Sequence, residues 1–90
     1  MNVKIKTFII INKFGIHTRP AVLLAKTANK FNSKIVFVKD GLEIDAKSVM
    51  GILLLTADYG SKIMITAKGE DALQAIEALG NLINSKFGEE

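Results

Sequence analysis

The hydrophobic and polar positions of this chain change their period several times, and each change marks a predicted element. Strands are expected where β-branched and other apolar residues alternate or run together, and helices where apolar residues return every three or four positions. The predicted strands are residues 3–11, 34–39, 42–45 and 63–67. The predicted helices are residues 18–31, 49–55 and 71–86. This β-α-β-β-α-β-α order favours an α+β fold, an open-faced β-sandwich in which a four-stranded antiparallel sheet carries three helices on one face.

The first predicted strand differs from the others at its end. Residues 8–11 are four consecutive apolar residues, Phe-Ile-Ile-Ile. A strand that is apolar on both faces is typical of the interior of a sheet. We therefore expect this strand to lie between two neighbouring strands.

Turn and capping residues mark several element boundaries. Pro20 is expected one step inside the start of the first helix, where its missing N–H leaves no hydrogen bond unmade. Asp40-Gly41 is a strong hairpin signal between the second and third strands. Ser48 is a candidate N-cap for the short second helix.

The second and third predicted helices have different apolar faces. The core face of the third is expected at helical spacing, at Ala72, Ile76, Leu79 and Ile83. The second helix is apolar almost all round, with Ile52 and Leu55 expected in the core. It is either buried on both sides or presents an exposed patch, which would consist of Val49, Met50 and Leu53.

Length and composition limit the class of protein. Ninety residues, 49% of them hydrophobic, are expected to form one domain spanning residues 1–90. The absence of cysteine excludes disulfides and zinc–thiolate sites, and with a single histidine it makes a metal site unfavourable. No cofactor is expected. The N-terminal apolar run is too short for a signal peptide or a membrane span, so we expect a cytoplasmic protein.

The net charge of +3 raises the question of nucleic-acid binding. The lysines are spread over all the predicted elements, and no phenylalanine lies inside a basic cluster. This pattern is not typical of a nucleic-acid interface, for which only Lys34, Phe37 and Lys39 are weak candidates. A mild basic excess also suits docking onto acidic protein partners.

The candidate chemistry lies in residues 14–21, Phe-Gly-Ile-His-Thr-Arg-Pro-Ala, which hold the only histidine of the chain. His17 is predicted at a helix start, where unsatisfied N–H groups and the helix dipole favour an anion. The planar donor fork of Arg19 suits a pair of phosphoryl oxygens. An imidazole can take up a phosphoryl group and pass it on. A lone histidine is more often structural or simply exposed, and that interpretation also stands.

Two motifs make the chain similar to the HPr family, the histidine phosphocarriers of the bacterial phosphoenolpyruvate-dependent phosphotransferase system. Residues 15–21, Gly-Ile-His-Thr-Arg-Pro-Ala, match the family's active-site run, Gly-(Leu/Ile)-His-(Ala/Thr)-Arg-Pro-Ala. Residues 47–51, Lys-Ser-Val-Met-Gly, match its second signature, Lys-Ser-(Ile/Val)-Met-Gly, about thirty residues downstream. Chain length and element order agree as well, so the resemblance covers essentially the whole chain.

The resemblance implies a carrier whose partners supply the catalysis. His17 would accept the phosphoryl group on Nδ1, and Arg19 would neutralise its charge. The N–H groups of Thr18 and Arg19 would complete the cradle. Enzyme I would load the group, and an enzyme IIA protein or domain would unload it for sugar uptake. The residues expected to contact these partners are Thr18, Val22, Val49, Met50 and Leu53.

The resemblance also gives Ser48 a second role beside capping, as the site of regulatory phosphorylation by an HPr kinase/phosphorylase. A phosphate is compatible with a helix N-terminus, where the dipole favours negative charge. A carrier that presents one face to successive partners is expected to be a monomer.

Three alternatives are weighed against sugar transport. The apolar stretch 53–57 is nearer to regulatory or nitrogen-type paralogues, which would signal through protein binding. A small nucleic-acid-binding module is the second. The third is a hydrolase with His17 as base, but neither a nucleophile nor an orienting carboxylate lies near the motif in sequence, where Glu43 and Asp45 are distant.

Overall fold

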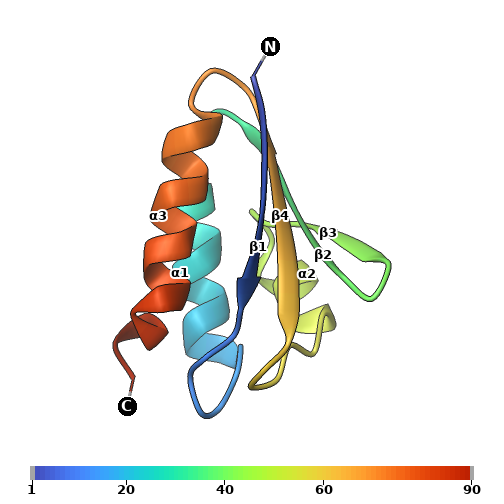
Figure 1. The fold of residues 1–90 in the computed structure, drawn as a ribbon, viewed down its shortest axis with the longest axis vertical. Helices are drawn as coiled ribbons and strands as arrows, with labels where there is room; N and C mark the ends of the chain where they lie inside the picture. The colour runs from blue at the N-terminus through green and yellow to red at the C-terminus, as the bar shows by residue number, and fades with distance from the viewer. Residues whose placement is uncertain (1, 90) are drawn as a thin grey trace.

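The computed structural model describes residues 2–89 and has the predicted order of elements (Figure 1). The strands are β1 (Val3–Ile9), β2 (Lys34–Lys39), β3 (Leu42–Asp45) and β4 (Lys62–Lys68). The helices are α1 (Thr18–Ala28), α2 (Val49–Leu54) and α3 (Ala72–Asn84), followed by the 3₁₀ turn η1 (Lys86–Gly88).

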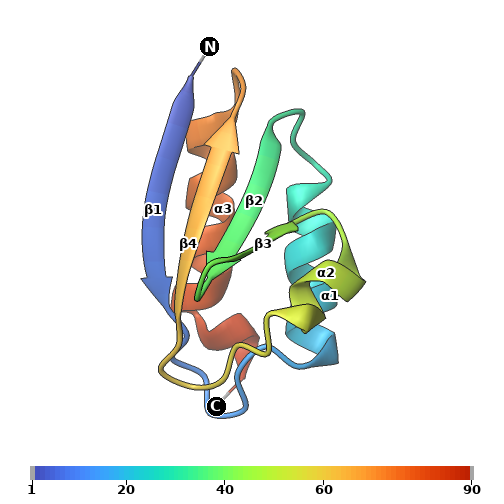
Figure 2. The ribbon, with the colours of Figure 1, turned by 90° about the vertical axis from the view of Figure 1, so that its right-hand side faces the viewer.

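The four strands form one antiparallel sheet in the order β1-β4-β2-β3. The helices lie together on one side of it, and Figure 2 looks onto the other face, which is open. The α+β open-sandwich prediction is therefore confirmed. The hairpin predicted at Asp40-Gly41 joins β2 to β3, and both of these residues have positive φ.

The prediction that the first strand lies inside the sheet is wrong. β1 is an edge strand that pairs only with β4, and it ends at Ile9 instead of residue 11. Phe8 points into the core, whereas Ile9 is 42% exposed. The chain then leaves the strand, and Ile10 is buried in a loop where its N–H donates to the Ser61 carbonyl. The apolar run therefore marks the end of an edge strand and the buried loop that follows it.

The helix ends differ from the predicted ones by a few residues. Pro20 is the third residue of α1, one residue further inside the helix start than predicted, and a third-position N–H also lacks a partner within the helix. α1 ends at Ala28, three residues earlier than expected. α3 ends at Asn84, because Lys86 and Phe87 take positive φ values of 58° and 55° that no α-helix accommodates.

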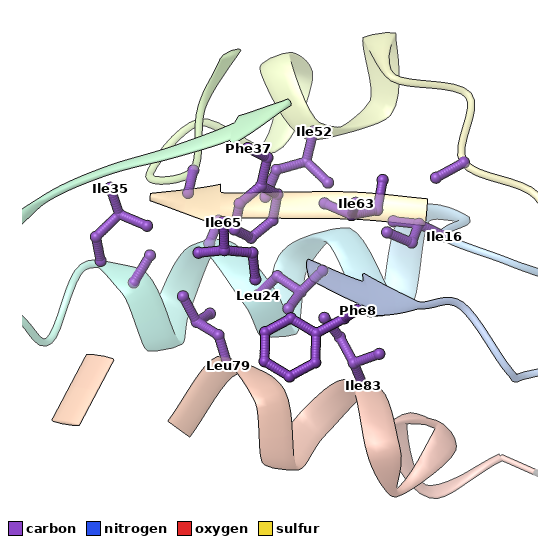
Figure 3. Close-up of a cluster of buried hydrophobic side chains, with 14 of the residues drawn as sticks. Phe8, Ile16, Leu24, Ile35, Phe37, Ile52, Ile63, Ile65, Leu79 and Ile83 are labelled. Carbon is purple, nitrogen blue, oxygen red and sulfur yellow. The ribbon is translucent and has the colours of Figure 1, made fainter. Parts of the chain in front are cut away.

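The core fills the space between the sheet and the helices (Figure 3). Phe8, Phe37 and Ile65 enter it from the strands, and Leu24 enters from α1. The predicted core face of the third helix is confirmed, since its four residues are all buried: Ala72, Ile76, Leu79 and Ile83. Burial of Ile52 and Leu55 is confirmed as well.

At the end of the helical layer far from His17, a carboxylate links the start of α3 to the segment that follows α1. Asp71, at the start of α3, accepts hydrogen bonds from the backbone N–H of Asn32 at 2.8 Å and of Ser33 at 3.0 Å. It also accepts from the Ser33 hydroxyl. The bond from this hydroxyl and those from the two N–H groups hold the pKa of Asp71 below its ordinary value of 3.8.

We expect Asp71 to make the fold sensitive to acid. Because its pKa is lower in the folded chain, its contribution to the free energy of unfolding is complete above the ordinary value and is lost as pH falls through the lowered one. The free energy of unfolding, measured with urea, should therefore fall more steeply for the wild type than for Asp71→Asn between roughly pH 5 and pH 2. Parallel pH profiles for the two proteins would contradict this role.

Candidate functional site

The loop before α1 is held in a shape that requires glycine. Gly15 has a φ of +65°, and a Cβ there would lie 2.5 Å from the Ala57 carbonyl oxygen. The next residue, Ile16, donates its N–H to the same oxygen at 2.8 Å. This contact fixes the loop against the segment that follows α2. It places His17 at the N-cap position of α1, as the sequence predicts.

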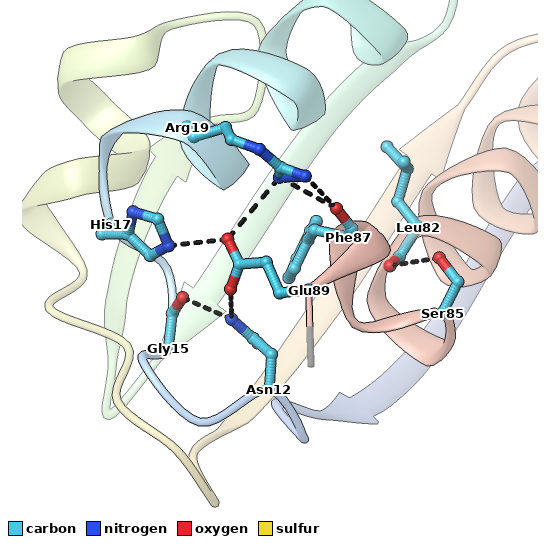
Figure 4. Close-up of polar contacts among 8 residues, drawn as sticks. All are labelled: Asn12, Gly15, His17, Arg19, Leu82, Ser85, Phe87 and Glu89. Atoms are coloured by element: carbon cyan, nitrogen blue, oxygen red, sulfur yellow. Dashed lines mark hydrogen bonds and ion pairs between the residues drawn. The ribbon is translucent and has the colours of Figure 1, made fainter.

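The imidazole of His17 lies at the surface, with 42% of the side chain exposed. Its Nε2 atom is 2.7 Å from Oε2 of Glu89, while the other ring nitrogen points away from that carboxylate (Figure 4). Among residues 2–89, Nδ1 makes no hydrogen bond. The Phe14 ring meets the imidazole edge to face, with centroids 6.3 Å apart. The nitrogen that the family resemblance assigns to phosphoryl acceptance is thus the unengaged one.

Arg19 is held beside the histidine by the C-terminal turn. Its Nη1 donates to the Phe87 carbonyl oxygen at 2.9 Å, and Nη2 donates to the same oxygen. Nη1 also lies 3.5 Å from Oε2 of Glu89 (Figure 4). Half of the side chain stays exposed, so the guanidinium is both anchored and accessible to an anion.

Two residues that the sequence analysis missed complete this cluster. Asn12 is fully buried and donates from Nδ2 to the Gly15 carbonyl at 2.7 Å and to Oε1 of Glu89 at 3.0 Å. Burial raises the pKa of Glu89, but hydrogen bonds from Asn12 and His17 and the charges of His17 and Arg19 together lower it below its usual value. Glu89 is therefore an ionised acceptor at neutral pH.

The sequence contains no orienting carboxylate near the motif, but the fold brings a distant one to the ring. Glu89 is 72 residues away in sequence, and the C-terminal turn brings it to the ring. The one local signal for this cluster is Asn12, which directly follows the apolar run at residues 8–11. Such a position indicates a buried polar residue but does not identify its partner.

Ser48 is confirmed as the N-cap of α2, since its hydroxyl accepts a hydrogen bond from the Gly51 N–H at 3.0 Å. α2 packs against α1, so this cap and His17 belong to neighbouring helices.

The structure also shows which residues of α2 are exposed. Met50 is 70% exposed and Leu54, which was not predicted, is 66% exposed. Val49 and Leu53 are half-buried beside them.

We call the α2 residues Val49, Met50, Leu53 and Leu54 the α2 patch. Two of the residues expected to contact partners lie on α1, where Thr18 is exposed and Val22 is half-buried. α2 and α1 pack together, so the helix that bears the patch neighbours the helix that His17 caps. An exposed apolar patch of this kind is typical of a protein interaction surface.

The structure argues against the nucleic-acid-binding alternative, because its one candidate aromatic residue is not accessible. Phe37 is fully buried in the core, so it cannot stack on a base, and Lys34 and Lys39 remain without an aromatic neighbour on that strand. Within residues 2–89, no group of three or more histidine, cysteine, aspartate or glutamate side chains is placed to hold a metal ion. None of the helices described is long and apolar enough to cross a membrane.

Comparison with known proteins agrees with the geometry. The PTS-HPr family, described as the PTS HPr component phosphorylation site, matches residues 4–85. The phosphocarrier protein HPr of Treponema pallidum is 38% identical over 86 residues, covering 96% of this chain and 98% of that protein. The phosphocarrier protein HPr of Cupriavidus necator is 40% identical over 80 residues, covering 89% of this chain and 90% of its own.

Solved structures give the same result. A crystal structure of HPr from Thermoanaerobacter tengcongensis is 48% identical and superimposes with a TM-score of 0.93, covering 97% of this chain and 98% of that one. The catabolite repression protein Crh of Bacillus subtilis is 36% identical with a TM-score of 0.74, covering 82% and 85% of the two chains. With its sequence, its fold and its histidine site all in agreement, the chain belongs to the HPr family of phosphocarrier proteins.

Proposed function

We propose that this protein accepts a phosphoryl group from phosphorylated enzyme I on Nδ1 of His17 and passes it to an enzyme IIA protein or domain for sugar uptake. The observation that carries the proposal is the geometry of His17. It is an exposed imidazole at the N-terminus of α1, with one nitrogen hydrogen-bonded to Glu89 and the other without a partner in the part of the chain that the structure describes. In this proposal residues 1–90 act as one domain.

The surroundings of His17 favour a dianionic group on the ring. The first N–H groups of α1, those of Thr18 and Arg19, have no acceptor within the helix and lie at the positive end of its dipole. The guanidinium of Arg19 supplies a full positive charge beside them. These donors would hold the phosphoryl oxygens during transfer, which is the usual way that proteins stabilise a transferring phosphoryl group.

The partners would dock over the surface around His17. Val22 on α1 and the α2 patch provide an apolar area near the histidine, and Thr18 is exposed at the start of α1. Methionine suits a surface that meets successive partners, because its flexible side chain repacks easily. We therefore assign contacts with enzyme I and enzyme IIA to Thr18, Val22, Val49, Met50 and Leu53, and add Leu54.

The test is to incubate the protein with enzyme I, phosphoenolpyruvate and Mg²⁺ and record its intact mass. We expect a gain of one phosphoryl group that mild acid removes, because a phosphohistidine is acid-labile whereas a phosphoserine is not. The reaction without enzyme I is the control. A protein that stays at its unmodified mass with enzyme I from the same organism would refute the proposal.

We also propose that an HPr kinase/phosphorylase modifies Ser48 and that the added charge slows the loading of His17. Ser48→Asp is expected to lower the loading rate about fivefold or more, the effect of ~1 kcal/mol of unfavourable charge at a docking surface. Aspartate caps a helix as well as serine does, so the fold is expected to persist. Initial rates of mass gain with enzyme I measure the effect.

Ser48→Asn is the matched control for this prediction, because asparagine is an equally good N-cap without charge. It should load at the wild-type rate. If the aspartate variant also loads at that rate, charge at position 48 has no regulatory effect on His17.

A further inference from the structure

The two nitrogens of the His17 ring have different surroundings, and the difference comes from the C-terminal turn. Oε2 of Glu89 lies 2.7 Å from Nε2. An ionised carboxylate can only accept a hydrogen bond, so the bond exists only when Nε2 carries the proton. A neutral imidazole has one proton to place. The contact therefore selects the tautomer in which Nδ1 has a free lone pair.

We propose that Glu89 is a positioning residue that keeps the proton of His17 on Nε2 and thereby prepares Nδ1 to receive the phosphoryl group. The inference rests on the proposed function for its consequence. The tautomer itself, however, can be measured without any partner protein. Nothing in the local sequence around His17 indicates this role, because Glu89 is distant along the chain.

Glu89 is itself held from two further directions, as a group that orients another must be. Asn12 donates from Nδ2 to Oε1 of Glu89, and it is anchored by its second bond to the Gly15 carbonyl. Arg19 places its Nη1 3.5 Å from Oε2 of Glu89. Only 16% of the Glu89 side chain is exposed. The carboxylate is thus fixed by an amide, an imidazole and a guanidinium (Figure 4).

The buried amide of Asn12 supports a network organised around a negative charge. Among residues 2–89, Oδ1 of Asn12 is buried and has no hydrogen-bond partner. An unsatisfied buried acceptor is costly. The opposite orientation of the amide would place its oxygen against the carboxylate of Glu89. The Nδ2 group therefore faces Glu89 and the Gly15 carbonyl and donates to both, and Oδ1 is left without a partner.

The selected tautomer gives phosphoryl transfer a simple proton balance. The lone pair of Nδ1 forms the new N–P bond, and the group of enzyme I that carried the phosphoryl leaves with the electron pair of the bond that breaks. The proton on Nε2 stays in place, so the phosphorylated ring is a cation that faces the carboxylate of Glu89. In the onward transfer the ring departs as neutral imidazole with its proton already on Nε2. Neither step requires a proton from solvent.

The test is ¹⁵N NMR of the His17 ring, with the pH raised until the ring ¹⁵N shifts no longer change, so that only the neutral imidazole is observed. In the wild type we expect the Nε2–H tautomer to predominate strongly. In Glu89→Ala the Nδ1–H tautomer should gain population, toward the ratio of an exposed histidine in an unstructured peptide. Glu77→Gln is the matched control, since it removes one carboxylate from the exposed side of α3 and should leave the tautomers unchanged.

Kinetics add a second readout. The loading rate of Glu89→Ala is expected to fall about tenfold or more, the usual scale for groups that orient a functional histidine. Thermal unfolding checks that the variant is folded. In Glu89→Gln, the amide oxygen can still accept from Nε2–H, so this variant should keep part of the wild-type tautomer preference.

An unchanged tautomer ratio in folded Glu89→Ala would overturn the inference, even if the wild type loads normally with enzyme I. A different pair of results separates the role of Glu89 from the proposed carrier function. A shifted tautomer ratio would establish the positioning role of Glu89, and a wild type that fails to load would then count against the proposed function alone.

Discussion

Replacement of His17 by alanine is expected to abolish phosphoryl uptake from enzyme I while leaving the fold in place. The side chain is 42% exposed, and among residues 2–89 its hydrogen-bond partner is Glu89. The free energy of unfolding should therefore change by no more than about 0.5 kcal/mol. No other side chain can take over the chemistry, because the chain has no second histidine and no cysteine. Intact mass measures uptake, and thermal unfolding measures stability.

The same experiment separates His17 from Ser48. A phosphoryl group on serine survives mild acid, so any acid-stable mass gain in His17→Ala would report modification of a hydroxyl by a contaminating kinase. Acid-labile uptake at the wild-type rate would instead show that the acceptor is not His17.

Removal of the guanidinium is expected to have the second largest effect. Arg19→Ala should lower the rate of phosphoryl uptake about 10²- to 10³-fold, the loss that follows removal of one preorganised donor from a developing anion. The structure explains why the donor is preorganised, because the Phe87 carbonyl fixes both terminal nitrogens of the guanidinium beside His17. Rapid-quench measurement of uptake from phosphorylated enzyme I gives the rate.

Two further variants give this prediction its specificity. Arg19→Lys keeps the charge but not the planar fork, so it should recover only part of the rate. Lys26→Ala removes an exposed cation from the last turn of the same helix and should cost little. If Lys26→Ala and Arg19→Ala slow uptake equally, the guanidinium contributes only general attraction between the proteins.

The fold could be predicted well where one periodicity governs a whole element. The spacing of Leu79 and Ile83 identified the buried face of α3, and Asp40-Gly41 identified the β2–β3 hairpin. The position of β1 could not be predicted in this way. The apolar residues after Phe8 are explained by a buried loop, and an apolar run alone cannot distinguish that loop from a central strand.

The site, like the fold, could be predicted from the sequence only where its residues are close together along the chain. His17 and Arg19 lie in one short run, so helix-start signals and a family motif are enough to identify them. Asn12 and Glu89 could not be paired from sequence, since they are 77 residues apart and meet only through the turn at Phe87. Local patterns describe faces and caps, but they carry no information about which distant carboxylate reaches a given ring.

The central claim is that this chain carries a phosphoryl group from one protein to another. The most direct test is to load the protein with enzyme I, purify the phosphorylated form, add enzyme IIA, and follow the intact masses of both proteins. The account predicts that the phosphoryl mass moves from this protein to enzyme IIA and that the carrier returns to its unmodified mass. If the phosphorylated protein loses its group to water at the same rate with and without enzyme IIA, the carrier function is contradicted.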